Sequence, residues 1–141
     1  MRNEEIRHVA SLTMRKLILL AVVFVSVSAG ASAQTKVNVK FARGAHSVTL
    51  RGSVSGYEYV DYLLEASSGQ GMSVSISSSS KFPQFVIFDK NMANLEGSHG
   101  DTYWWGRLPS DGTYTVRVLL PRSDARRKGS KANYSLLIKI F

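Results

Sequence analysis

The stretch LPSDGTYTVRVLLPRSDARRKGSKANYSLLIKIF, residues Leu108 to Phe141, decides the fold class of this chain. Apolar and polar side chains alternate in two of its segments, Tyr114–Leu120 and Tyr134–Ile140. A period of two places successive side chains on opposite faces of a strand, so each segment is predicted to be a half-buried β-strand. The connection between them concentrates positive charge within ten residues, against which only Asp124 is acidic. The basic residues are Arg122, Arg126, Arg127, Lys128 and Lys131.

The same period of two recurs through the preceding sequence and brings the number of predicted strands to eight. Glycine-containing turns separate most of them, as at Ser55-Gly56 and Ser110-Asp111-Gly112. Eight short strands joined by regular turns predict a single all-β domain, a β-sandwich or jelly-roll. The six further strands are predicted at Lys36–Phe41, Ser47–Arg51, Tyr59–Glu65, Met72–Ser77, Gln84–Phe88 and Thr102–Trp105.

The first third of the chain has the features of an export signal. A basic start at Met14-Arg15-Lys16 is followed by the apolar run Leu17–Val27 and by Ala31-Ser32-Ala33, a typical cleavage site. We therefore expect residues 14–33 to be a signal peptide and residues 34–141 to be the mature β-sandwich domain. Residues 1–13 fit no part of a signal and are predicted to be an upstream over-call. An extended N-terminal region of the signal and an uncleaved membrane anchor are the alternatives.

Charge and cysteine content restrict the function. The whole chain has a net charge of +8, and loss of four basic and two acidic residues with the leader leaves +6. A basic surface suits acidic clefts, anionic envelope surfaces or nucleic acid, and export makes nucleic acid the least favoured partner. The chain has no cysteine, which excludes disulfides, thiolate catalysis and iron–sulfur clusters.

Catalysis is poorly supported by the remaining residues. His46 and His99 stand in glycine-containing or strand-start segments without an acid or nucleophile at a motif spacing. Asp89, Glu96 and Asp101 lack the alternating ligand pattern of a calcium loop. We therefore predict a protein that is not an enzyme, with no catalytic residue, no metal site and no cofactor.

Aromatic residues give the second candidate surface. On a strand, Trp104 faces one side, and Tyr103 and Trp105 face the other. One face is expected to be core, and the other either packs at a sheet edge or stacks on a sugar. Tyr57 precedes a strand, where it is either a contact residue at the sandwich rim or a corner tyrosine bonded to its own backbone.

The chain resembles the periplasmic inhibitors of g-type (goose-type) lysozyme found in Gram-negative bacteria, over Lys36–Ile140. The distinguishing motif is R-x-D-A-R at Arg122–Arg126, in the connection between the last two strands. The other motifs are V-x-V-x-F-x-x-G at Val37–Gly44, G-Y-x-Y at Gly56–Tyr59, G-Q-G-M-S-V-S-I at Gly69–Ile76, L-P-x-x-G-x-Y at Leu108–Tyr114 and A-x-Y-x-L-x-I at Ala132–Ile138.

The resemblance implies a sandwich of eight antiparallel strands and a protein partner, g-type lysozyme, whose active-site cleft is blocked. It places the functional positions at Tyr57, Arg122 and Arg126. Candidate additional contacts are Tyr59, Asp124, Arg127 and Lys128.

The chain departs from the family pattern at Pro121, which restricts the backbone just before Arg122. We expect a periplasmic protein, with secretion as the alternative, and no membrane span after signal cleavage. The competing function is a non-catalytic carbohydrate- or envelope-binding module that uses Trp104 or Trp105.

Overall fold

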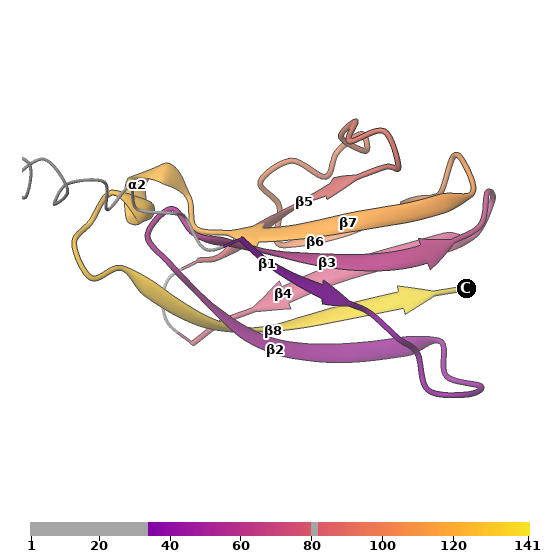
Figure 1. The fold of residues 1–141 in the computed structure, drawn as a ribbon, viewed down its shortest axis with the longest axis horizontal. Coiled ribbons are helices and arrows are strands. Elements are labelled where there is room, and N and C mark those ends of the chain that lie inside the picture. Colours follow the sequence, from indigo (N-terminus) through magenta and orange to yellow (C-terminus); the bar gives the residue numbers. More distant parts are fainter. Residues whose placement is uncertain (1–33, 80–81) are drawn as a thin grey trace, which may run out of the picture. The chain divides into compact units, whose positions relative to one another are not determined.

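The computed structural model describes residues 34–79 and 82–141, which form two four-stranded β-sheets packed face to face (Figure 1). The odd sheet has the order β1 (Gln34–Asn38), β3 (Tyr59–Ala66), β7 (Gly112–Leu119), β5 (Gln84–Phe88). The even sheet has the order β2 (Ser47–Ser55), β8 (Lys131–Ile140), β4 (Gly71–Ser77), β6 (Tyr103–Arg107). Consecutive strands alternate between the sheets, so every connection crosses from one sheet to the other.

The predicted all-β fold and its eight strands are confirmed, with two differences in detail. The first strand lies earlier than expected, at Gln34–Asn38, and it pairs with β3 in parallel, whereas all other pairs are antiparallel. The chain leaves β1, crosses to the even sheet as β2 and returns as β3. It reverses direction twice, so β3 runs parallel to β1. A parallel pair of strands needs a crossover connection of this kind.

The predicted signal peptide and the thirteen residues before it lie outside the described residues. Within residues 34–79 and 82–141, no helix has both the length and the apolar character needed to cross a bilayer.

The core lies between the sheets and is formed by the inward side chains of the alternating strands. It includes Phe85, Tyr114, Leu136 and Ile138, which are fully buried. This arrangement is what the period of two predicts, since every second side chain of each strand points to the opposite sheet.

Two tyrosines connect the sheets across the core. The hydroxyl groups of Tyr62 on β3 and Tyr134 on β8 lie 2.8 Å apart in a hydrogen bond. Gly52 on β2 makes room for this contact, because a Cβ there would lie 2.5 Å from the Tyr134 hydroxyl oxygen. Burial raises the pKa of both tyrosines, so both hydroxyl groups stay protonated and able to donate.

The outer face of the odd sheet carries an ion pair between a buried aspartate and a partly buried arginine. Arg117 on β7 donates to Asp61 on β3 through Nε, at 2.7 Å from Oδ1, and through Nη2, at 2.9 Å from Oδ2. The guanidinium carbon lies 4.0 Å from the ring centre of Tyr59, and Gln34 on β1 donates to Asp61 at 3.1 Å. Asp61 is 2% exposed, and its partners come from β1 and β7, so the cluster links three neighbouring strands on the outer face.

Candidate functional site

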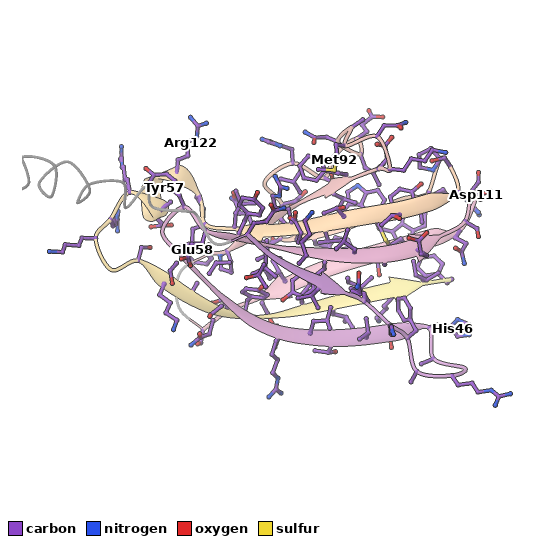
Figure 2. All side chains as sticks on the ribbon, in the orientation of Figure 1. His46, Tyr57, Glu58, Met92, Asp111 and Arg122 are labelled. Carbon is purple, nitrogen blue, oxygen red and sulfur yellow. The ribbon has the colours of Figure 1, made fainter. Side chains whose placement is uncertain are left out.

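Two connections that carry the predicted site residues meet at one end of the sandwich. They are the β2–β3 turn, residues 56–58, and the β7–β8 connection, residues 120–130; we call this end the α2 end. The backbone N–H of Gly56 donates to the carbonyl of Ser130 at 3.0 Å, which joins the two connections. Figure 2 shows Tyr57, Glu58 and Arg122 at this end, and His46 and Asp111 at the opposite end.

The β7–β8 connection contains one helical turn, α2 (Arg122–Ala125), where the sequence predicted a loop. Pro121 sets up this turn: with φ −55° and ψ 147° it stands just outside the helix, and its carbonyl accepts from Asp124 N at 2.9 Å and Ala125 N at 2.8 Å. The buried Ala125 anchors the turn on the core. Pro121 therefore fixes the backbone φ at the N-cap position, directly before the turn that carries the arginines.

Arg122 and Arg126 lie on the same side of this turn, because residues four apart on a helix are neighbours. Arg126 N donates to the carbonyl of Arg122 at 3.3 Å, and both side chains are exposed. Neither guanidinium group has a hydrogen-bond or ion-pair partner within the described residues. Their donors are therefore available to a group from another molecule.

The remaining basic residues of the connection differ from this pair. Arg127 lies near Asp124, with Nη1 3.9 Å from Oδ1, so the single acidic residue faces Arg127. Lys128 is exposed beyond the turn. The structure thus separates two unpartnered arginines from a third that has an acidic neighbour.

Tyr57 is a rim residue. It is 66% exposed on a turn that Glu58 closes by donating from its N–H to the carbonyl of Ser55 at 3.0 Å. Its hydroxyl group has no partner among the described residues, so Tyr57 is not a corner tyrosine bonded to its own backbone. Tyr59, two residues later, is half-buried under Arg117 and belongs to the outer face of the odd sheet.

Phe82 is a further exposed residue at the α2 end, and the sequence analysis did not single it out. It is 77% exposed in the β4–β5 connection. The pairing of Gln84 with Leu119 places Phe82, two residues earlier, at the same end of the sandwich as α2. A lone aromatic residue after a run of serines gives no sign of its exposure, which depends on strand pairing far away in sequence.

The other candidates from the sequence lie elsewhere. His46 and His99 are exposed, as expected for loop histidines, and Asp89 accepts from the backbone N–H groups of Asn91 and Ala93 within its own loop. No three acidic or histidine side chains gather into a metal-binding group in the described part of the chain. These residues therefore add neither a metal-binding group nor a further contact to the α2 end in the described part of the chain.

The aromatic cluster divides as predicted. Trp104 is 8% exposed, and its indole N–H donates to the carbonyl of Glu96 at 2.9 Å, so it belongs to the core. Tyr103 and Trp105 are 59% and 57% exposed on the outer face of the even sheet.

An all-β domain that exposes arginine and tyrosine side chains from two joined loops has the features of a protein-binding module. No family model matches the chain. A curated relative, the inhibitor of g-type lysozyme from Escherichia coli K12, is 34% identical over 131 residues, covering 90% of this chain and 97% of the relative. The chain therefore belongs to the family of inhibitors of g-type lysozyme.

Solved structures agree. The periplasmic g-type lysozyme inhibitor of Aeromonas hydrophila is 39% identical with a TM-score of 0.69, over 77% of this chain and 97% of that one. The inhibitor of Salmonella Typhimurium is 32% identical with a TM-score of 0.61, over 76% and 98%. These relatives are inhibitors of an enzyme and are described as periplasmic, which supports the predictions of a non-enzymatic and periplasmic protein.

Proposed function

We propose that the protein inhibits g-type lysozyme in the periplasm, and that the α2 end blocks the active-site cleft with Arg122, Arg126 and Tyr57. Family membership supports the choice of target. In the structure, the observation that best supports this site is the pair of exposed guanidinium groups on one helical turn, next to an exposed tyrosine. Neither guanidinium group has a partner among the described residues.

The chemistry of the target suits this pair. A lysozyme cleft carries acidic residues that cleave the glycosidic bond. Arginine presents a planar fork of donors that matches a carboxylate in a bidentate geometry, and this contact strengthens as water is excluded. Tyr57 adds rigid contact area with few rotatable bonds, which is why tyrosine is frequent at protein interfaces.

The net charge of the domain affects how it approaches its target. The mature domain has a net charge of +6, so it would repel a basic enzyme before contact. Complementarity is then local to the cleft. With a basic target we expect added salt to raise the association rate, because salt screens the overall repulsion more than a desolvated contact pair.

A lysis assay tests the proposed function. Purified residues 34–141 are added to g-type, c-type and i-type lysozymes acting on the same bacterial cell suspension, and turbidity is followed. We expect the g-type enzyme alone to be inhibited at equimolar protein. No inhibition of a g-type enzyme would refute the proposal, and equal inhibition of the c-type enzyme would remove the specificity.

A further inference from the structure

The outer face of the even sheet is rich in hydroxyl groups and has no carboxylate among its described residues. Odd-numbered residues of β2, β8, β4 and β6 all point outward, as the pairing register requires. Eight of them are serine or threonine, and none carries a carboxylate. The hydroxyl residues are Ser47, Thr49, Ser53, Ser55, Ser73, Ser75, Ser77 and Ser135, and the cations are Arg51, Arg107, Lys131 and Lys139.

An aromatic platform lies at one edge of this face. The rings of Trp105 and Phe141 are stacked, with centroids 6.4 Å apart and planes 18° apart, and both are more than half exposed. Gly71 makes the platform possible, since a Cβ there would collide with the Phe141 ring. Tyr103 stands two residues before Trp105 on the same outward side, about 7 Å along β6. Adjacent exposed aromatic side chains of this kind are typical of binding surfaces.

Polar groups continue from the platform across the sheet. Trp105 pairs with Ser73, Ser73 with Lys139, and Lys139 with Ser47, so one row runs from aromatic ring to hydroxyl to ammonium. Adjacent strands are about 4.8 Å apart, which places the Lys139 backbone about 10 Å from that of Trp105. Arg107 uses one N–H to hold the carbonyl of Gly69 at 2.9 Å.

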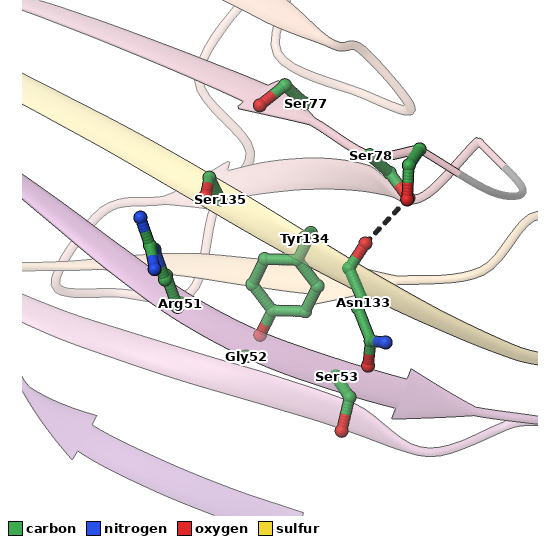
Figure 3. Close-up of a pocket in the computed structure, with 9 residues that line it drawn as sticks. Arg51, Gly52, Ser53, Ser77, Ser78, Asn133, Tyr134 and Ser135 are labelled. Atoms are coloured by element: carbon green, nitrogen blue, oxygen red, sulfur yellow. Dashed lines mark hydrogen bonds between the residues drawn. The ribbon is translucent and has the colours of Figure 1, made fainter.

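Nearer the α2 end, the same face contains an open groove of ≈ 600 Å³. Figure 3 shows Arg51, Ser53, Ser77, Asn133 and Ser135 around it. Ser78 closes one side by donating its hydroxyl to the Asn133 carbonyl at 2.6 Å. The face thus combines an aromatic platform at its β6 edge with hydroxyl groups and cations on the neighbouring strands.

We propose that this face binds an anionic glycan chain, and that the glycan is the carboxylate-bearing cell-wall polysaccharide that lysozymes cleave. Aromatic faces stack on the apolar face of a sugar ring, rows of hydroxyl groups exchange hydrogen bonds with sugar hydroxyl and amide groups, and the cations pair with carboxylates. Glu96 borders the outer edge of β6, but it belongs to the β5–β6 connection and not to this face.

The aromatic platform of this glycan face lies at the end of the sandwich opposite the α2 end. Trp105 shares its row with Ser47, at the start of β2, next to His46, which Figure 2 shows at the opposite end from Tyr57. The choice of this polysaccharide rests on the proposed function, but binding to the face is measured without lysozyme and can fail or succeed independently of inhibition. If both hold, the protein is retained on the polymer where its target enzyme acts, with the arginine pair still free.

Co-sedimentation with purified, insoluble cell-wall sacculi tests the glycan face. We expect wild-type residues 34–141 to sediment with sacculi, and Trp105→Ala and Lys139→Ala each to lower the apparent affinity about tenfold, the scale of one lost stacking or ionic contact of roughly 1.4 kcal/mol. Tyr57→Ala and the double variant Arg122→Ala, Arg126→Ala are matched controls, because they remove an aromatic ring and two cations at the α2 end. Both should sediment like wild type.

Soluble competitors distinguish glycan recognition from simple charge attraction. Soluble cell-wall glycan fragments should release the protein, whereas polyglutamate at equal carboxylate concentration should not. Absence of wild-type binding, full binding by Trp105→Ala and Lys139→Ala, or equal release by polyglutamate would each overturn the proposal. The far-ultraviolet circular dichroism spectrum and the urea unfolding midpoint of Trp105→Ala and Lys139→Ala should equal those of wild type, which shows independently of lysozyme that both variants are folded.

Discussion

Arg117 and the pair Arg122 and Arg126 show two opposite uses of the same side chain, a few residues apart in sequence. Arg117 binds Asp61 in a two-pronged ion pair and lies against the ring of Tyr59, and its hydrogen bond to Asp61 raises its pKa. Arg122 and Arg126 extend into solvent from α2 and have no partner among the described residues.

This difference in partners distinguishes an arginine that stabilises the fold from arginines that are available to bind another protein. A guanidinium group whose donors are satisfied by a buried carboxylate has little left to offer another molecule, and its loss leaves that carboxylate unpaired. An exposed guanidinium group contributes little to folding, since water replaces any contact it makes. Its donors become valuable only when a carboxylate of another protein excludes that water.

The largest expected effect is on stability, at Arg117. Arg117→Ala leaves Asp61 buried at 2% exposure without its main partner, so we expect a loss of about 3 kcal/mol or more in the free energy of unfolding. Urea unfolding followed by tryptophan fluorescence measures it. The paired change Asp61→Leu, Arg117→Met removes both charges and should recover most of the loss. A cost below about 1 kcal/mol for Arg117→Ala would show that the ion pair does not hold the odd sheet.

The next effect is on inhibition, at the arginine pair. Arg122→Ala and Arg126→Ala should each raise the inhibition constant for g-type lysozyme about 30-fold, the change expected for a hot-spot loss of about 2 kcal/mol. Arg→Lys at either position keeps the charge but not the planar fork, so it should restore only part of the affinity. An inhibition constant that stays at the wild-type value in either alanine variant would remove that residue from the site.

A smaller effect is expected at Tyr57. Tyr57→Ala removes exposed contact area and should weaken inhibition by about 1 kcal/mol, roughly fivefold, without changing stability. Tyr57→Phe separates the ring from the hydroxyl group: near-wild-type inhibition assigns the effect to the ring, and a loss equal to that of Tyr57→Ala assigns it to the hydroxyl group. Wild-type inhibition by both variants would confine the site to α2.

The smallest effect on lysozyme binding is expected at the two basic residues that follow the arginine pair in sequence. Arg127→Ala and Lys128→Ala should change the dissociation rate of the lysozyme complex by less than about twofold, because exposed rim charges contribute a few tenths of a kcal/mol. Their influence falls on the association rate and fades as salt rises. Surface plasmon resonance at low and high salt measures both rates. A large increase in dissociation for Arg127→Ala would extend the binding surface to the Arg127–Asp124 pair.

The strands were predictable because alternation is a local property, and the structure confirms it from Val116 to Leu119 and again in β8. The parallel pairing of β1 with β3 was not predictable, because no local pattern records which edge a first strand joins. The single turn of α2 is too short to produce a helical period. The Arg117–Asp61 pair could not be predicted from the sequence either, because the two residues face each other only in the β3–β7 register.

For the site, the motif and the resemblance indicated Tyr57, Arg122 and Arg126. The contact that joins their two loops, Gly56 to Ser130, depends on tertiary structure. The exposure of Phe82 and the shared outward side of Trp105 and Lys139 likewise follow from strand order, which the sequence does not reveal.

The double variant Arg122→Ala, Arg126→Ala tests the central claim most directly, with unfolding and inhibition of g-type lysozyme measured on the same preparation. The account predicts a free energy of unfolding within about 0.5 kcal/mol of wild type, as for exposed surface changes. It also predicts inhibition weakened by at least about a hundredfold, because two hot-spot contacts are lost together. A folded double variant that inhibits as well as wild type would contradict the account.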